Sequence, residues 1–216
     1  MSPSRTRRRK SHKKKSNNKK LILIAAVTVI AVIVVSYILV SNNSPSEEIP
    51  SSNKVLLTTS MGNITIQLRD DMPITTTNFK KLVQQGVYDD TIFHRVISGF
   101  MIQGGDPFGT GVGDPSIPNI NDELSDNAEN RKNVRGTISM AKKGDPITGE
   151  AIPNSASSQF FINVVNNSNE VFDESYPVFG EVIDGLDVVD AIANVNTDSN
   201  DKPLEDMKLI NATFVD

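Results

Sequence analysis

The side chains best suited to chemistry lie in one stretch, residues 93–106, where two apolar runs flank a Ser-Gly pair in a β-hairpin pattern. If the strands pair about that turn, Arg95 lies opposite Gln103. Alternation along the strands then turns Ile97 and Met101 toward the same face as the guanidinium. The pattern predicts one surface that combines a cation, an amide and apolar side chains.

Two plainer interpretations of this stretch stay open on spacing alone. Arg95 is also typical of a solvated charge on an edge strand, because most arginines in sheets are surface residues. Phe100 and Met101 are equally typical of ordinary core packing. The hairpin pattern by itself does not decide between a functional face and a structural one.

Composition and spacing exclude several kinds of site. The chain has no cysteine, and its two histidines are His12 and His94, so a cysteine nucleophile or a His-rich metal site is ruled out. Lys142-Lys143-Gly144 lacks the pattern of a phosphate loop, and the polar segment 107–132 lacks the ligand order of a calcium loop. Alternation points His94 away from Arg95, which favours a hydrogen-bonded structural histidine over a general base.

The elements that must position the hairpin are mostly strands. Helical spacing predicts helices at 73–85 and 184–193. Phe160 and Phe161 point to opposite faces of one predicted strand, so one of them is available to line a groove. The other strands are predicted at 55–59, 64–68, 136–141, 178–182 and 207–215. Many strands with two well-separated helices indicate a closed or nearly closed antiparallel barrel.

Five motifs carry a resemblance to a known family. The longest is Phe-His-Arg-Val-Ile-x-Gly-Phe-Met-Ile-Gln-Gly-Gly-Asp at 93–106. The others are Pro-x-Thr-x-x-Asn-Phe-x-x-Leu at 73–82, Gly-x-x-Ser-Met-Ala at 136–141, Ser-Gln-Phe-Phe-Ile at 158–162 and Val-Phe-Gly-x-Val at 178–182. Together they resemble the cyclophilins, the cyclosporin-type peptidyl-prolyl cis-trans isomerases. The resemblance covers Lys54 to Asp216 and implies a mainly β fold, a closed eight-stranded antiparallel β-barrel capped by two α-helices.

The resemblance also implies an activity and the residues that perform it. It implies isomerisation of X-Pro bonds without a cofactor, with Arg95 donating a hydrogen bond to the prolyl nitrogen. Gln103 is expected to orient Arg95, and Phe100, Met101, Phe161 and Phe172 to form the proline pocket. The full set of expected catalytic residues is Arg95, Gln103 and Phe100, and that of substrate-binding residues is Ile97, Met101, Ala141, Lys142 (by its main chain), Gln159, Phe161, Phe172 and Tyr176.

Two departures from the family pattern affect the expectations. Members that bind cyclosporin tightly have a Trp at the position of Val171, so weak cyclosporin binding is expected here. Tyr176 stands where many members have His, and it keeps a ring with a hydrogen-bonding tip.

A rival hypothesis for the function stays open. In it the groove belongs to a peptide-binding chaperone module whose catalysis is incidental or absent.

The N-terminal region predicts a membrane anchor. Residues 1–20 carry ten basic side chains and no acidic one, and Leu21 to Val40 is an uncharged run of 20 residues. Such a run spans about 30 Å as a helix, which matches the hydrocarbon core of a bilayer. The run is longer than the apolar region of a cleaved signal peptide and lacks a good cleavage site, so an uncleaved signal anchor is predicted.

Charge then predicts the orientation of that anchor. The positive-inside rule places residues 1–20 in the cytoplasm and, beyond a flexible linker at 41–53, the domain at 54–216 in the extracellular or periplasmic space. Residues 21–216 hold 12 basic and 26 acidic side chains, which argues against nucleic-acid binding. The expected partners are proline-containing polypeptides in extended or unfolded segments, and the protein is expected to be a monomer attached to the cell membrane.

Overall fold

A computed structural model describes residue 35 and residues 49–216, and residues 49–216 form one compact unit. The predicted basic tail, the predicted anchor apart from Val35, and residues 41–48 of the predicted linker lie outside the described residues. Within the described part, no helix is both long and apolar enough to cross a membrane. The elements are β1 (Lys54–Thr59), β2 (Gly62–Leu68), α2 (Pro73–Gln84), β3 (Thr91–Ile92), β4 (Arg95–Ile97), β5 (Met101–Gly104), α3 (Ala128–Arg131), β6 (Thr137–Met140), β7 (Phe160–Asn163), α4 (Glu170–Ser175), β8 (Val178–Asp184), α5 (Leu186–Ala193) and β9 (Lys208–Val215).

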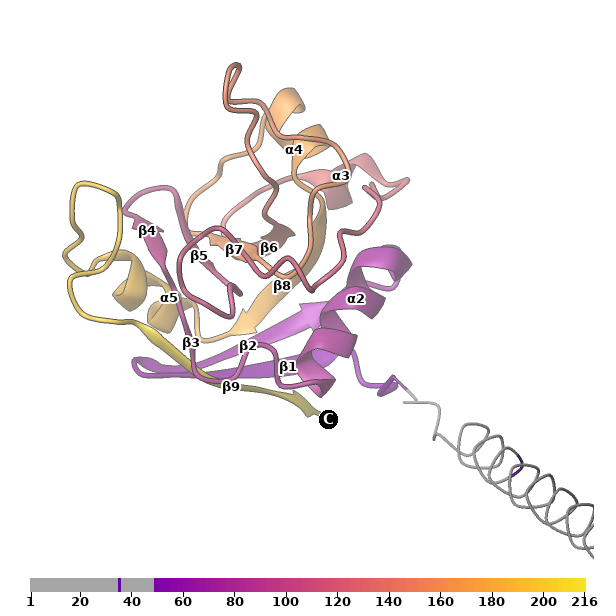
Figure 1. Cartoon of the computed structure of the whole chain (residues 1–216), viewed down its shortest axis with the longest axis horizontal. Coiled ribbons are helices and arrows are strands. Elements are labelled where there is room, and N and C mark those ends of the chain that lie inside the picture. The colour runs from indigo at the N-terminus through magenta and orange to yellow at the C-terminus, as the bar shows by residue number, and fades with distance from the viewer. Residues whose placement is uncertain (1–34, 36–48) are drawn as a thin grey trace, which may run out of the picture. The chain divides into compact units, whose positions relative to one another are not determined.

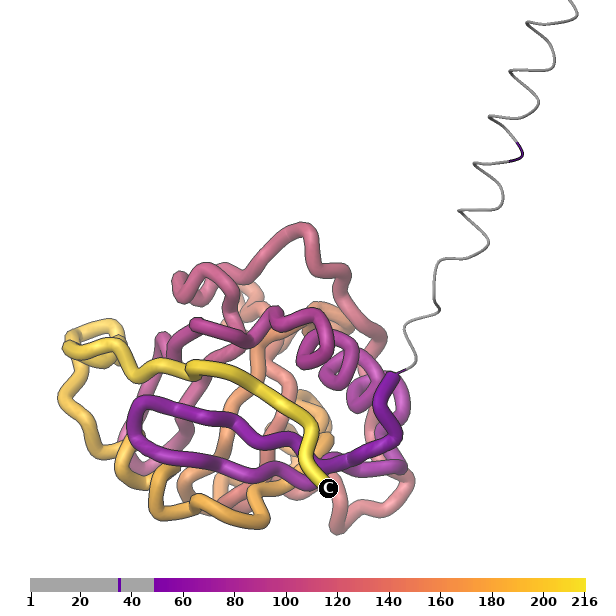
Figure 2. The backbone as a smooth tube through the Cα atoms, turned by 90° about the horizontal axis from the view of Figure 1, so that it is seen from below, coloured from indigo at the N-terminus to yellow at the C-terminus, as the bar shows by residue number. Residues whose placement is uncertain are grey.

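The strands form a single curled antiparallel sheet in the order β3-β9-β1-β2-β8-β6-β7-β5-β4 (Figure 1). Figure 2 shows β9, in yellow, running beside the β1–β2 hairpin, in indigo. The mainly β antiparallel fold is therefore confirmed. The number of strands differs from the prediction, because the described sheet has nine strands rather than eight.

The closure of the sheet also differs from the predicted closed barrel. No ladder among the described strands joins β3 to β4, the two ends of the sheet. The two strands are neighbours in sequence, and the backbone between them turns to other partners. Phe93 N donates to Met207 O at 2.8 Å, and Val96 N donates to Asp201 O at 2.8 Å. The segment 91–97 thus crosses from one edge of the sheet to the other without completing a ring.

The interior of the curled sheet holds the hydrophobic core, with α2 packed beside it. Phe79 of α2 contacts three other rings, with centroid distances of 5.0 Å to Tyr88, 5.7 Å to Phe160 and 5.1 Å to Phe179. All four side chains are fully buried. Helix α5 packs against β2, β4 and β5, and Figure 1 shows it well away from α2. The two longer helices lie where the sequence pattern predicts them.

The long polar segment 107–132 has a structural role that its composition did not reveal. Helix α2 begins at Pro73, which is suited to a first helical position, but its N-cap residue, Met72, makes no side-chain hydrogen bond. The carboxylate of Glu123 accepts hydrogen bonds from Ile74 N at 3.0 Å and from Thr75 N at 2.9 Å instead. A negative charge at a helix N-terminus is favourable, so Glu123 fixes this segment against α2.

Gly185, at the start of α5, provides a direct test of the packing between α5 and the sheet. It has φ +86°, and a Cβ there would lie 2.2 Å from Asn63 O and 3.0 Å from Ile64 Cα. We expect Gly185→Ala to destabilise the protein by about 2 kcal/mol or more, because the left-handed conformation and the backbone contact both disfavour it. Gly149→Ala is the matched control, since Gly149 has φ +74° and nothing within 4 Å. Equal changes in the free energy of unfolding for the two variants would contradict the packing argument.

Candidate active site

The β4–β5 hairpin forms the base of the candidate site. Its register pairs Arg95 with Gln103 and Ile97 with Met101, as the turn and the alternation predicted. The turn is made possible by Gly99, which has φ +72°, and Phe100 N donates back to Ile97 O at 3.0 Å. Phe100 therefore lies in the turn rather than in β5.

Strand β7 pairs with β5 and supplies the next wall of the site. Phe160 belongs to the core cluster inside the sheet, and Phe161 lies on the opposite face, where it is 5% exposed. The prediction that one of the two phenylalanines is available to line a groove is confirmed. Helix α4 adds Phe172 and is followed by its C-cap residue, Tyr176, and its N-cap residue Asn169 accepts a hydrogen bond from Phe172 N at 3.1 Å.

These rings form an aromatic wall. Phe172 lies 5.9 Å from Phe100, 6.0 Å from Phe161 and 4.6 Å from Tyr176, measured between ring centroids. Phe161 also contacts Tyr176 edge-on at 5.7 Å. Such edge-to-face and tilted contacts fix aromatic rings more firmly than burial alone. The wall is therefore a preformed apolar surface.

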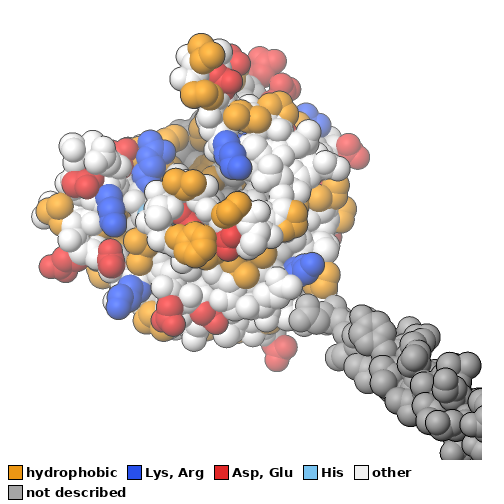
Figure 3. Space-filling model, in the orientation of Figure 1, with side chains coloured by type: hydrophobic (Ala, Val, Ile, Leu, Met, Phe, Trp, Pro, Cys, Tyr) orange, Lys and Arg blue, Asp and Glu red, His pale blue; other side chains and the backbone are white. Residues whose placement is uncertain are grey.

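The wall encloses a small pocket of about 110 Å³. Its volume is below the roughly 300 to 1,000 Å³ typical of sites for drug-sized ligands, so it suits one side chain. Nine of the eleven predicted site residues line it, namely Arg95, Phe100, Met101, Gln103, Ala141, Lys142, Phe161, Phe172 and Tyr176. Ile97 and Gln159 are not among the lining residues. Figure 3 shows hydrophobic side chains gathered around a hollow on this face of the molecule, with basic side chains beside it.

The polar side chains of the site are held by contacts that differ from the expected ones. Gln103 Nε2 donates to Gln159 Oε1 at 2.9 Å, and Gln159 Nε2 donates to Gly111 O at 3.1 Å. Arg95 Nε pairs with Asp201 Oδ2 at 3.3 Å. The structure therefore shows Gln103 bonded to Gln159 and Arg95 bonded to Asp201, rather than Gln103 orienting Arg95.

Lys142 contributes to the site through a partly buried ion pair. Its side chain is 3% exposed, and its ammonium lies 2.7 Å from Asp122 Oδ2. Asp122 N also donates to Asn154 Oδ1 at 2.7 Å. Asp122 thus fastens both ends of the segment 142–154 next to the pocket, which sequence reasoning missed because it interpreted 107–132 only as a surface loop.

His94 is buried, as the alternation predicted, with 7% of its surface exposed. Neither ring nitrogen makes a hydrogen bond of conventional geometry among the described residues, although the side chain of Gln159 interacts with the ring. Burial lowers the pKa of His94, against a smaller opposing effect of the Asp106 carboxylate. The neutral imidazole is favoured at this position.

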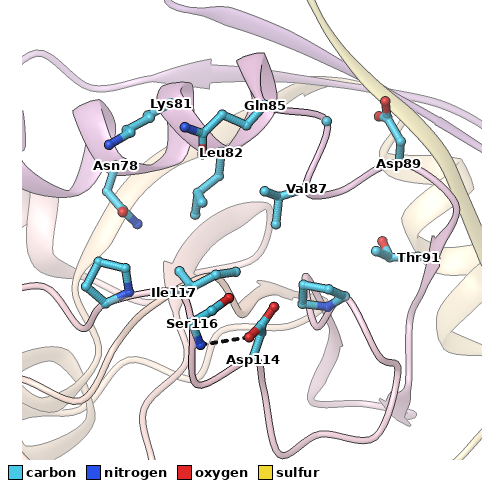
Figure 4. A pocket seen from close by; sticks show the side chains of 13 residues that line it. Asn78, Lys81, Leu82, Gln85, Val87, Asp89, Thr91, Asp114, Ser116 and Ile117 are labelled. Atoms are coloured by element: carbon cyan, nitrogen blue, oxygen red, sulfur yellow. Dashed lines mark hydrogen bonds between the residues drawn. The ribbon is translucent and has the colours of Figure 1, made fainter. Parts of the chain in front are cut away.

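A second, larger cavity lies between α2 and residues 107–118, with a volume of about 620 Å³ (Figure 4). Leu82, Val87 and Ile117 give it apolar walls, and Asp114 accepts a hydrogen bond from Ser116 N at 2.7 Å. It contains none of the predicted site residues. The smaller pocket remains the better candidate despite its size, because it alone places a guanidinium beside an apolar aromatic wall. Within the described residues, no group of His, Cys, Asp or Glu side chains is arranged to hold a metal ion.

The comparisons with known proteins agree on one family. The model for cyclophilin type peptidyl-prolyl cis-trans isomerase matches residues 54–214. The peptidyl-prolyl cis-trans isomerase CYP18-1 of Arabidopsis thaliana is 41% identical over 163 residues, which cover 74% of this chain and 94% of that protein. The larger CYP71 of the same plant is also 41% identical, over 74% of this chain but only 24% of its own length.

A solved structure gives the same result. The crystal structure of a Cryptosporidium parvum cyclophilin type peptidyl-prolyl cis-trans isomerase, determined in the presence of the dipeptide Ala-Pro, matches with a TM-score of 0.66 and 32% identity. The match covers 76% of this chain and 99% of the other.

Proposed function

The chain belongs to the cyclophilin-type peptidyl-prolyl cis-trans isomerases, and we propose that it isomerises X-Pro bonds by hydrogen-bond donation from Arg95 to the prolyl nitrogen, with the proline ring held in the aromatic pocket. The pocket supports this proposal because it is small, apolar and bordered by a guanidinium. Proline-containing segments in extended or unfolded polypeptides are the substrates that such a pocket fits. No cofactor takes part in the proposed mechanism.

The mechanism follows from the electronic structure of the imide bond. Its partial double-bond character gives a rotation barrier of about 18 to 20 kcal/mol. In the twisted transition state this resonance is lost, and the prolyl nitrogen becomes a better hydrogen-bond acceptor. A fixed donor at that nitrogen therefore binds the transition state more strongly than either ground state. Arg95 can act as this donor at any physiological pH, because a guanidinium stays protonated.

The remaining residues have roles in binding. Phe100, Phe161 and Phe172 hold the ring of the substrate proline, and the flanking chain rotates beside Arg95. Gln103 and Gln159 present amide groups to the peptide backbone, and they also hold each other in place. Ala141, Lys142 (through its main chain), Met101 and Tyr176 complete the proposed contacts. Val171, which is 76% exposed, offers no aromatic surface at the rim, so cyclosporin is proposed to bind weakly.

Phe172 allows the pocket to be tested separately from the donor. We expect Phe172→Ala to raise KM for a short X-Pro peptide by about tenfold with a smaller change in kcat, because three ring contacts are lost while Arg95 remains. Steady-state kinetics on the peptide would measure both constants. Val171→Ala on the same helix is the matched control, because Val171 is exposed and absent from the pocket lining. A fall in kcat alone would contradict a binding role for Phe172.

The location of the enzyme is a separate part of the proposal. The uncharged run Leu21 to Val40 and the ten basic residues before it support a single-pass anchor with the N-terminus in the cytoplasm. The enzyme would then act as a monomer on secreted or surface proteins while they fold outside the cytoplasm. In cells that express the chain with an N-terminal epitope tag, protease added outside the cytoplasmic membrane, after removal of any outer membrane, should digest the domain and leave the tag protected. Complete protection of the domain would contradict this orientation.

A peptide-binding chaperone module is the alternative function, and its stoichiometry distinguishes it from an isomerase. An isomerase accelerates the proline-limited refolding of an unfolded secreted protein when present at a small fraction of the substrate concentration. A module that only holds peptides has to match the substrate concentration to have an effect. We expect acceleration at a ratio of about one to a hundred. An effect seen only near equal concentrations would favour the chaperone module.

A further inference from the structure

The ion pair between Arg95 and Asp201 joins the candidate catalytic side chain to a loop far away in sequence. Asp201 Oδ2 lies 3.3 Å from Arg95 Nε, and the two side chains are 42% and 44% exposed. The backbone of the same residue is fixed to the neighbouring position of β4, because Asp201 O accepts a hydrogen bond from Val96 N at 2.8 Å. Asp201 is therefore attached to β4 by its main chain and to the guanidinium by its carboxylate.

The loop places this carboxylate through its own internal contacts. Thr197 and Pro203 form a β-bridge at its base, and Asp198 N donates to Lys202 O at 2.8 Å. Asp198 Oδ1 accepts from Asn200 N at 2.8 Å and from Lys202 N at 3.0 Å. Asp201 itself has φ +62°, a left-handed conformation that Asp and Asn tolerate better than most residues. The position of Asp201 therefore does not depend on its pairing with Arg95.

The geometry of the pair leaves the catalytic donors free. Asp201 contacts Nε, on the inner side of the guanidinium, so the two terminal NH2 groups remain available to the pocket that Arg95 lines. A flexible arginine side chain at a half-exposed site would otherwise occupy several rotamers. Exposed ion pairs shift such an equilibrium by up to about fivefold.

We propose that Asp201 is a positioning residue that holds the Arg95 guanidinium in the rotamer that presents its terminal nitrogens to the proline pocket. This inference rests on the proposed function of Arg95. Asp201 does not touch the substrate, and its effect on the rate is transmitted entirely through Arg95. The proposal differs from the expected role of Gln103, whose amide is bonded to Gln159.

The test uses Asp201→Asn in the full chain, purified in detergent. Asn keeps the left-handed backbone and removes only the charge. We expect kcat/KM for a short X-Pro peptide to fall about threefold to fivefold, with unchanged peptide affinity and an unchanged midpoint of thermal unfolding. Glu205→Gln is the matched control, because it removes an exposed charge close by in the sequence and should leave the rate unchanged.

A double-mutant cycle separates positioning from a general structural effect. In an Arg95→Ala background, measured at higher enzyme concentration, Asp201→Asn should have no further effect. The same severalfold loss in that background would overturn the proposal, as would an unchanged or faster rate for Asp201→Asn alone. A folded Arg95→Ala variant that keeps the wild-type rate would instead refute the proposed function itself, and the role of Asp201 with it.

Discussion

Replacing Arg95 with alanine is expected to lower kcat/KM for a short X-Pro peptide by about a hundredfold or more. The change removes a hydrogen-bond donor whose interaction is strongest in the twisted transition state, and losses of roughly this size follow the removal of one such donor. The side chain is 44% exposed and lies outside the hydrophobic core. The variant should therefore fold normally, with nearly the wild-type midpoint of thermal unfolding.

Arg95→Lys serves as the matched variant for charge. It keeps the positive charge but loses the planar fork of donors and the Nε that pairs with Asp201. We expect a rate between those of Arg95→Ala and the wild type, and peptide affinities that differ little among the three proteins. A folded Arg95→Ala variant that retained more than half of the wild-type kcat/KM would contradict the donor role.

Asp106→Asn is expected to lower the free energy of unfolding by about 2 to 3 kcal/mol. Asp106 is fully buried at the end of the stretch 93–106 that contains the β4–β5 hairpin. Its carboxylate accepts hydrogen bonds from the main-chain nitrogens of four residues and from one hydroxyl, all in the loop that follows: Phe108 N, Thr110 N, Thr110 Oγ1, Gly111 N and Gly113 N. An amide at this position would turn an NH2 group toward some of these donors and leave them unpaired.

A control variant and a peptide-binding measurement test whether the loss of stability in Asp106→Asn arises from the loop at 107–113. Asp114→Asn is the matched control, because Asp114 lies just beyond the loop and its carboxylate accepts one hydrogen bond, from Ser116 N. It should change the free energy of unfolding by less than about 1 kcal/mol. Because Gly111 O also accepts a hydrogen bond from Gln159, Asp106→Asn should weaken peptide binding as well. A stability equal to that of the wild type would contradict the role of Asp106 as the centre of the loop.

The difference in stability between the wild type and Asp106→Asn should depend on pH, and the direction follows from the pKa of Asp106. Burial raises the pKa of Asp106, but the hydrogen bonds from Phe108, Gly113, Thr110 and Gly111 outweigh burial, and the net shift is below the ordinary value of 3.8. A lowered pKa in the folded state contributes stability above the unfolded pKa, and that contribution is lost as the pH falls through the folded pKa. The difference in stability between the wild type and Asp106→Asn should therefore be constant near neutral pH and shrink below about pH 4. A difference that stayed constant down to pH 2 would contradict this assignment.

The parts of the site that could be predicted from sequence depend on local patterns. The register between Arg95 and Gln103 follows from one turn and from alternation along two short strands. Alternation likewise places Phe160 in the core and Phe161 at the pocket. Helix α4 was not predicted, although Asn169 three residues before Phe172 is a typical N-cap signal. The roles of Phe172 and Tyr176 came from the family resemblance alone.

The parts that could not be predicted depend on contacts between distant segments. Asp201 reaches Arg95 across 106 positions, and Asp122 reaches Lys142 from within a loop with no periodic pattern. The sheet stays open because Phe93 extends the pairing of β3 with β9, whereas Val96 bonds to Asp201, so that no ladder among the described strands joins β3 to β4. Sequence spacing contains no information on which carboxylate of an acidic domain approaches a given cation, so these contacts required the fold.

The central claim is that this pocket catalyses rotation about X-Pro bonds. The most direct test follows the cis-to-trans relaxation of a short X-Pro peptide in the presence of the full chain, with folding and peptide binding verified independently. We predict that the relaxation rate rises in proportion to the protein concentration. The claim would be contradicted by a folded protein that binds the peptide but leaves its relaxation time at the uncatalysed value, on the order of tens to hundreds of seconds.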